Sequence, residues 1–443
     1  MSDVAEERLH QSASQERPSP RWRLEERPTW TADVTARDLH NLRVHRWFFF
    51  PHSFAPALVA NLTAEWKLLD GAVIADPYCG AGTTLVAAQQ LGLSVIGWDL
   101  SPLAVFASRV KLAHLDPGAL CDAWAEITAS VRREQEVPCL DACEDLVRRA
   151  IPDDSLSALL RLWSTIATMQ SRVDDQSNEA QASAMHWDAL RLAILAELPS
   201  FSRLTRKGGW LAKTEPAAGA SQVLDRVASR VRMMALDLAD GADSRLRVSP
   251  AKIELADARA LPFQSAGADA IITSPPYPNR HDYTRMFGVE LAFGFLDDHS
   301  IRQLRYQSLS SHPEARPNRP DQSGYTEPPS LTTTINEIAA RIDDGHKRRM
   351  SQMLSGYFLD IWLSLREAHR ILRPGGHAAY VVGNARYKGV AIEVDTLVGG
   401  LAENIGFAVD HVYVARRRGN SAQQMKNYGR QPQRESVVVL RRS

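Results

Sequence analysis

Residues 76–84 read Asp-Pro-Tyr-Cys-Gly-Ala-Gly-Thr-Thr, and this stretch decides the fold of the 443-residue chain. It follows the short apolar segment 72–75, which predicts a strand, and it opens a helical pattern over residues 85–91. Gly80 and Gly82 allow a tight turn, so that a ligand can approach the backbone closely where the helix begins. A strand, a glycine turn and a helix in this order are typical of nucleotide-binding α/β folds.

The next apolar segment, residues 94–97, leads to an acid. This is Asp99, which stands 17 residues after Gly82 (99 − 82). An acid at this place can accept hydrogen bonds from the ribose hydroxyls of a nucleotide-like ligand. It can equally cap the next helix, which residues 101–102 begin. Leu85 occupies the position of the third glycine in the dinucleotide fingerprint, which argues against NAD.

A second motif lies about 200 residues later. Residues 273–277 read Thr-Ser-Pro-Pro-Tyr and follow the apolar segment 268–272. Ser274 offers a hydroxyl acceptor, and the two prolines donate no backbone N–H, so the carbonyls beside them stay free to accept hydrogen bonds. Tyr277 adds a flat aromatic face, and acceptors beside a stacking face are what holding an extruded nucleobase requires. Taken alone, the same run also fits a strand followed by a Pro-Pro turn.

Together the two motifs resemble those of the DNA amino-methyltransferases, which act on cytosine N4 or adenine N6. In that family the first motif is the S-adenosylmethionine (AdoMet) loop and the second is catalytic. Residues 45–56 resemble the family's N-terminal cofactor-contacting segment. Residues 255–259, Leu-Ala-Asp-Ala-Arg, resemble the segment whose acid lies near the adenine of the cofactor.

The resemblance covers residues 45–113 and 250–443. Within the second part, residues 368–384 are similar to the helix, turn and strand found in AdoMet-dependent methyltransferases, and the last two strands are expected at 407–415 and 436–440. The fold that the resemblance implies is α/β and Rossmann-like, with a doubly wound, mostly parallel sheet and a largely helical insertion.

The implied cofactor is S-adenosyl-L-methionine. The residues implied to bind it are Phe54, Asp76, Pro77, Cys79, Gly80, Gly82, Thr83, Thr84, Asp99 and Asp257. The implied catalytic residues are Ser274, Pro275, Pro276 and Tyr277. The residues expected at the base pocket or on DNA are Arg280, Tyr283, Arg417 and Arg418.

These residues suggest a mechanism. An exocyclic amine is a poor nucleophile because its lone pair is delocalised into the ring of the base. Ser274 Oγ and the Pro275 carbonyl can accept hydrogen bonds from the amino protons, and Tyr277 can stack on the base. The sulfonium already makes the methyl group electrophilic, so no metal is required. In the resembling family Ser at the first motif position is commoner for cytosine N4, so we expect cytosine N4, with adenine N6 as the alternative.

Two other classes compete with this interpretation. RNA guanine-N2 methyltransferases use similar Pro-Pro-Tyr chemistry, but they usually carry Asp or Asn before the prolines and an N-terminal RNA-binding domain, for which residues 1–45 are too short. The second class is a non-enzymatic AdoMet-binding protein with a decayed site. Both motifs are intact here, which argues against decay.

We divide the chain into four parts. Residues 1–38 are rich in Glu, Arg, Ser, Gln and Pro and are expected to be poorly ordered. Residues 39–114 form the first part of a methyltransferase domain with the AdoMet loop. Residues 115–250 are a helical insertion, and residues 251–443 are the second part of the domain, with the catalytic motif and a basic C-terminal loop.

Sequence recognition must come from outside the methyl-transfer core. The insertion and the polar stretch 297–345, whose prolines discourage regular structure, are expected to flank a DNA cleft. Residues 207–210 and 302–312 are candidate contacts. The insertion fits equally well as a structural subdomain or an oligomer interface.

Composition neither requires nor excludes nucleic acid, because Lys plus Arg and Asp plus Glu both number 52. The end of the chain is basic: from residue 416 onward the only acid is Glu435, against Arg416, Arg417, Arg418, Lys426, Arg430, Arg434, Arg441 and Arg442. This tail can contact phosphates or can simply be a solvated end. The expected partners are double-stranded DNA and a cognate restriction endonuclease or phage-defence component.

The four cysteines show no paired Cys-x-x-Cys spacing, and we interpret them as reduced thiols. There is no apolar run of 18 residues and no signal-peptide pattern at the N-terminus. We therefore expect a cytoplasmic protein with no membrane partner and no metal.

Overall fold

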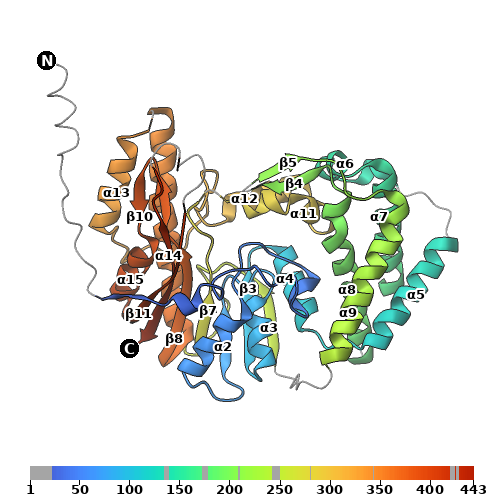
Figure 1. The fold of residues 1–443 in the computed structure, drawn as a ribbon, viewed down its shortest axis with the longest axis horizontal. Coiled ribbons are helices and arrows are strands. Elements are labelled where there is room, and N and C mark those ends of the chain that lie inside the picture. Colours follow the sequence, from blue (N-terminus) through green and yellow to red (C-terminus); the bar gives the residue numbers. More distant parts are fainter. Residues whose placement is uncertain are drawn as a thin grey trace.

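The computed structural model describes residues 22–443 except 134–138, 172–177, 208–209, 242–249, 280, 343, 420–424 and 426–428. Figure 1 shows a sheet with its covering helices and, beside it, a separate group of helices, α5 and α7 to α9. The loops that carry both motifs lie at one edge of this sheet. Among the described helices, none has both the length and the apolar character needed to cross a bilayer.

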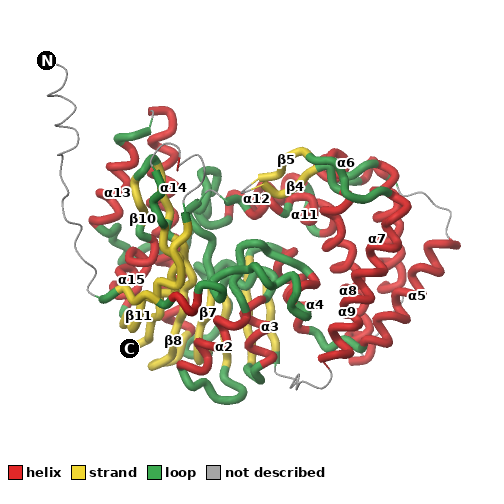
Figure 2. Tube along the Cα trace, viewed as in Figure 1, coloured by secondary structure: helices red, strands yellow, loops and turns green. Residues whose placement is uncertain are grey.

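The sheet has eight strands in the order β1-β11-β12-β8-β7-β2-β3-β6. Their bounds are β1 Leu24–Glu26, β2 Val73–Asp76, β3 Ser94–Asp99, β6 Ala251–Leu255, β7 Ala268–Thr273, β8 Leu372–Gly383, β11 Phe407–Arg418 and β12 Gln433–Arg442. β12 runs antiparallel to both neighbours, and the other neighbouring strands pair in parallel. Figure 2 shows these strands gathered in one layer. The expected mostly parallel sheet is confirmed.

Helices cover both faces of the sheet, as a doubly wound fold requires. One face packs against α13, α14 and α15, and the other against α2, α3 and part of α4. Neighbouring residues of one strand alternate between the two cores: in β7, Ile271 belongs to the first core and Ile272 to the second. The bounds are α2 Pro56–Glu65, α3 Thr83–Gln90, α4 Pro102–Leu112, α13 Pro329–Ala339, α14 Asp344–Ile371 and α15 Val394–Ile405.

The expectation that residues 1–38 are poorly ordered is wrong for the part that the structure describes, residues 22–38. β1 pairs in parallel with β11, and Trp30 and Val34 are buried. The Trp30 ring meets the Tyr413 ring of β11 edge-on, with centroids 5.2 Å apart. Composition failed here because a few apolar residues among many polar ones are enough to attach an extended segment to a sheet edge.

Residues between β3 and β6 form helices α5 Pro117–Arg133, α6 Asp145–Ala150, α7 Asp153–Ser171, α8 Asn178–Phe201 and α9 Val223–Gly241. They also form a two-stranded hairpin, β4 Leu204–Lys207 with β5 Trp210–Lys213, which the sequence pattern did not predict. The apolar core of these helices continues into α4 and into Trp47. The helical region is therefore packed onto the sheet domain through one uninterrupted core.

The stretch 297–345 is more regular than its prolines suggested. It contains α12 Asp298–Gln307 and α13, so the expectation of irregular structure is wrong for these residues. Pro329 stands at the first position of α13, where its missing N–H has no helical partner to lose. The remaining elements are α10 Tyr283–Met286, α11 Gly288–Gly294, the hairpin β9 Ala385–Tyr387 with β10 Val390–Ile392, and the short 3₁₀ helices Pro28–Trp30, His45–Trp47, Leu140–Ala142 and Ala220–Gln222.

Candidate active site

Two cavities lie at the carboxyl ends of the parallel strands, where ligands bind in open α/β sheets. The first, which we call the Gly80 cavity, is lined by residues at or just after the ends of β2, β3 and β6. They include Pro77, Tyr78, Gly80, Asp99, Ser101 and Ala258. The second, the Tyr277 cavity, is lined by residues that follow β7, by the ends of β11 and β12, and by the N-terminal segment. They include Thr35, Arg37, Pro275, Tyr277, Arg418 and Glu435.

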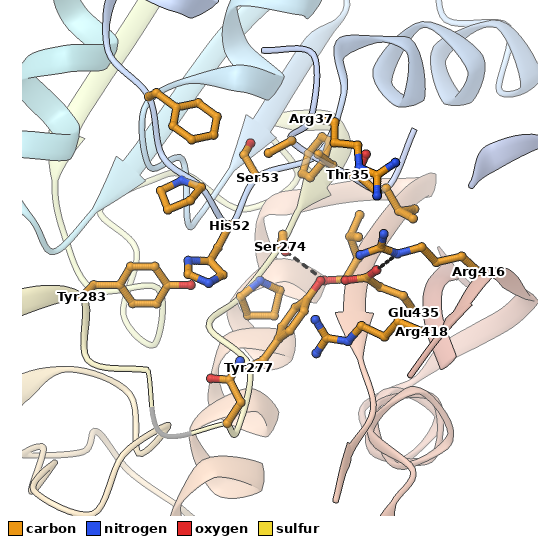
Figure 3. Close-up of a pocket in the computed structure, with 18 residues that line it drawn as sticks. Thr35, Arg37, His52, Ser53, Ser274, Tyr277, Tyr283, Arg416, Arg418 and Glu435 are labelled. Atoms are coloured by element: carbon orange, nitrogen blue, oxygen red, sulfur yellow. Dashed lines mark hydrogen bonds and ion pairs between the residues drawn. The ribbon is translucent and has the colours of Figure 1, made fainter. Parts of the chain in front are cut away.

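The two cavities meet. His52, Ser274 and Tyr283 line both of them. Figure 3 shows these three side chains in the Tyr277 cavity, together with Tyr277 and Arg418. A group bound in one cavity therefore borders a group bound in the other at Ser274.

The loop of the first motif is shaped by its glycines and by one buried acid. Gly82 has φ of 79° and stands directly before α3, and a Cβ there would lie 2.9 Å from Ser108 Oγ. Asp76 is buried under the loop and accepts hydrogen bonds from the Tyr78 N–H and from the Thr273 hydroxyl. Asp76 does not line either cavity, so its side chain supports the loop from below.

Asp99 holds the backbone around it and also faces a cavity. Its carboxylate accepts hydrogen bonds from Gly80 N at 3.0 Å and from Ser101 N at 2.8 Å, so it braces the glycine loop and the start of α4. It also lines the Gly80 cavity. Desolvation raises the pKa of this carboxyl, and the backbone hydrogen bonds oppose that shift.

Asp257 is engaged within the protein. Its carboxylate accepts hydrogen bonds from Arg259 Nε at 2.9 Å and Arg259 Nη2 at 2.6 Å. Arg259 is 1% exposed and also donates to Asp360 at 2.9 Å. The neighbouring Ala256 and Ala258 line the Gly80 cavity, but Asp257 itself does not.

The other residues expected to bind the cofactor divide between the two cavities and the core. Pro77 and Gly80 line the Gly80 cavity, whereas Phe54 lines the Tyr277 cavity. The remaining members of the first motif, Cys79, Gly82, Thr83 and Thr84, line neither cavity. Burial raises the pKa of the Cys79 thiol well above its ordinary value, which keeps it neutral.

The second motif places Ser274 where the two cavities meet and Tyr277 in the Tyr277 cavity alone. Ser274 donates its hydroxyl proton to the Val381 carbonyl at 3.0 Å and lies close enough to the Tyr277 phenol to act on its pKa, which still leaves an oxygen lone pair to accept a hydrogen bond. The Tyr277 ring lies against Gly383, where a Cβ would come within 2.7 Å of the ring. Burial raises the pKa of the Tyr277 phenol, and nearby Glu435 adds to this effect. Pro275 and Pro276 each line one cavity.

The residues predicted to contact the base or DNA are not all brought together. Arg418 and Tyr283 line the Tyr277 cavity. Arg417 instead forms an ion pair with Glu26 of β1 and does not line the Tyr277 cavity, so its contact with DNA stays a prediction. Its position follows from strand alternation, which sends Arg416 and Arg418 to one face of β11 and Arg417 to the other. Arg280 lies outside the described residues.

Sequence reasoning missed part of the site. Arg37 and His52 come from the N-terminal segment and line the Tyr277 cavity. Lys111 is buried and donates to the carbonyls of His45, Phe48 and Ala81 at 3.1, 2.7 and 3.0 Å, which ties this segment to the first motif. Burial lowers the pKa of Lys111 to about 7. His52 falls inside the N-terminal segment that carried a resemblance, but no pattern marked Arg37 or Lys111.

No family model matches the chain. It is 28% identical to the Type II methyltransferase M.BsoBI of Geobacillus stearothermophilus, and this match covers 90% of this chain and 86% of the other. It is 27% identical, over the same shares, to the Type II methyltransferase M.AvaI of Anabaena variabilis. Among solved structures, TrmN from Thermus thermophilus covers 88% of this chain and 49% of its own at 13% identity, with a TM-score of 0.29. That score supports no argument, so the fold assignment depends on the strand order. Along nearly its whole sequence the chain is therefore similar to Type II methyltransferases, which supports the DNA methyltransferase family and AdoMet as the methyl donor.

Proposed function

We propose that this chain transfers a methyl group from AdoMet to the exocyclic amine of a base extruded from double-stranded DNA, and that the base is cytosine, modified at N4. One observation carries the proposal. Ser274 borders both cavities, and its hydroxyl proton is already donated to Val381. A base amine in the Tyr277 cavity would therefore meet an acceptor at the boundary with the cofactor.

The residues fit the proposed ligands. The glycine loop and Asp99 would hold the cofactor in the Gly80 cavity, where AdoMet when bound supplies an electrophilic methyl group. Tyr277 would stack on the base, and Ser274 would accept a hydrogen bond from the amine and orient its lone pair. The proton that the amine releases would pass to water in the open Tyr277 cavity.

The helical region is our candidate for sequence recognition. Its hairpin β4–β5 carries Trp210, which is 58% exposed, next to Lys207. An exposed aromatic ring beside a cation is suited to contact with nucleic acid. A cognate restriction endonuclease or defence component is a further proposed partner, because Type II methyltransferases are among its relatives.

Nucleoside analysis tests the proposal directly. DNA from a methylation-free host that expresses the chain would be digested and analysed by mass spectrometry, and the same DNA would be read by single-molecule sequencing. We expect N4-methylcytosine in one short sequence. N6-methyladenine would keep the mechanism and overturn the target base. Methylation of host RNA in place of DNA, measured in the same cells, would overturn the substrate.

A further inference from the structure

Three arginines gather in a third pocket, outside both cavities of the active site. It lies between the N-terminal half of α14 and the loop that follows α12. Its lining includes His312, Arg316, Arg348, Arg349 and Gln352, and none of the described residues that line it is acidic. We call it the arginine pocket.

These arginines differ from others in the same part of the chain. Arg285 pairs with Glu314, Arg305 with Asp282, and Arg319 with Asp360. Over the described residues, no ion pair joins Arg316, Arg348 or Arg349 to an acid, and Arg348 and Arg349 are exposed. Cations repel one another, so a concave site that collects three of them, with no acid among its described lining residues, is suited to an anion from outside. Guanidinium groups favour phosphate in particular, because their planar forks match its oxygens.

The arginine pocket lies next to the active site. His312, which lines it, is hydrogen-bonded through Nε2 to Ser308 Oγ at 2.9 Å. Ser308 and the next residue, Leu309, line the Gly80 cavity. In α12, the helix just before Ser308, Arg305 Nε lies 2.9 Å from Asp282, which caps α10 just after the second motif. Figure 1 shows α12 between the sheet and the helical region.

This position favours a polymer over a free anion. A ligand that reaches the Tyr277 cavity and continues past α12 would carry negative charge at intervals of a few ångströms. The backbone of DNA has this property, with one charge per about 1.7 Å of duplex. A single inorganic phosphate would gain nothing from the neighbouring active site.

We propose that the arginine pocket binds phosphodiester groups of the DNA whose base is extruded into the Tyr277 cavity, and that it contributes affinity without reading sequence. This inference rests on the proposed function, because it takes the same DNA as its ligand. Phosphate contacts of this kind set the position of a protein on the duplex and make binding salt-dependent.

The salt dependence of DNA binding tests the proposal. The variant R348A/R349A would be compared with the parent by fluorescence anisotropy on a labelled duplex, from 50 to 200 mM salt. Log K falls linearly as log salt rises, and each lost phosphate contact makes this line less steep by about 0.9. We expect the slope of the variant to fall by about 2 and its low-salt affinity to fall at least about tenfold. AdoMet binding should stay unchanged in calorimetry.

Two controls keep the result specific. K67A/R373A removes the same charge from two exposed residues, one just before β2 and one at the start of β8, at the end of these strands opposite both cavities, and its slope should match that of the parent. R348K/R349K keeps the charge and should recover most of the slope, which rules out misfolding as the cause. Millimolar inorganic phosphate should not displace the duplex beyond the effect of its ionic strength. Displacement beyond that effect would show a free-anion site and overturn the proposal.

The outcome separates this inference from the proposed function. If the parent methylates DNA and the slope of R348A/R349A equals that of the parent, the arginine pocket is not a DNA contact. If the parent leaves DNA unmodified but the slope falls by about 2, the pocket binds DNA and the proposed reaction is wrong.

Discussion

The Oδ1 atom of Asp76 lies 2.6 Å from Oγ1 of Thr273, although the two residues are 197 positions apart. Both are buried, at the ends of the neighbouring parallel strands β2 and β7. Asp76 opens the first motif and Thr273 opens the second. This one hydrogen bond therefore fixes the glycine loop relative to Ser274, at the boundary of the two cavities.

This acid predicts a pH dependence of stability. Burial raises the pKa of Asp76 from 3.8 to about 6 in the folded protein. A raised carboxyl pKa means that the folded state binds more protons than the unfolded state between these values, so stability falls as pH rises from about 4 to about 6. At 1.36 kcal/mol per pKa unit the loss is about 3 kcal/mol.

Asp76→Asn removes the titrating group and should remove that loss. We expect the free energy of unfolding, measured with urea for both proteins, to fall less in the variant than in the parent as pH rises from 4 to 7. Subtracting the two curves cancels all other titrating groups. A difference that stays flat across this range would show that Asp76 keeps an ordinary pKa.

The conformation of the glycine loop gives a second prediction. Gly82→Ala forces a side chain into a left-handed conformation and brings its Cβ to 2.9 Å from Ser108 Oγ. Gly71 has almost the same φ, +80°, with no atom within 4 Å of the added Cβ, so Gly71→Ala is the matched control. Both variants should lose about 1–2 kcal/mol of folding stability, because an alanine side chain is strained in this left-handed backbone conformation. Gly82→Ala should lose a further ~1–3 kcal/mol of folding stability, because the added Cβ overpacks the site.

The same pair of variants separates strain from function. Calorimetry should show that Gly82→Ala weakens AdoMet binding at least about tenfold, which is about 1.4 kcal/mol of binding free energy. The reason is that the substitution displaces the glycine loop, which lines the Gly80 cavity. Gly71→Ala should bind AdoMet like the parent. Equal losses of affinity in both variants would mean that the loop position does not matter for the cofactor.

The sequence predicted those parts of the site that depend on local pattern. Apolar segments gave the strands that carry both motifs, and the glycines gave the turn before α3, because strand ends and tight turns are set by neighbouring residues. The doubly wound sheet came from the resemblance of the motifs. The carboxyl ends of parallel strands meet at one edge of a sheet. Asp99 and Ser274 each stand at such an end, so the predicted strands were enough to bring them to the same edge.

What the sequence could not predict depends on contacts between distant segments. Arg37 and His52 reach the Tyr277 cavity only because β1 adds to the edge of the sheet and carries the N-terminal segment past the second motif. The burial of Lys111 depends on carbonyls from two other segments. Neither Asp257 nor Arg417 showed its partner in the sequence, since an ion pair has no periodicity.

The alternation of β11 gives a third prediction. Arg418 lines the Tyr277 cavity, whereas Arg417 pairs with Glu26 and both of these side chains are at least half exposed. Arg418→Ala should lower kcat/KM for DNA at least about tenfold, as expected for the loss of a charge-assisted contact. Arg417→Ala should stay within about twofold, because exposed ion pairs contribute little. A larger effect of Arg417→Ala, measured on the same duplex, would contradict this assignment.

The fourth prediction concerns Ser274. Ser274→Ala removes the acceptor at the boundary of the two cavities and also the hydrogen bond to Val381. If this oxygen orients the amine during methyl transfer, kcat should fall roughly 100-fold, the effect of removing one preorganised hydrogen bond to a reacting group. AdoMet affinity, measured by calorimetry, should change by less than about threefold, because the residues expected to hold the cofactor stay in place.

Ser53→Ala is the control. It removes another hydroxyl from the Tyr277 cavity, one that donates to Thr83 at 2.8 Å, and it should leave kcat within about threefold of the parent. A fall in AdoMet affinity that matches the fall in kcat would assign Ser274 to the cofactor and overturn its role at the amine.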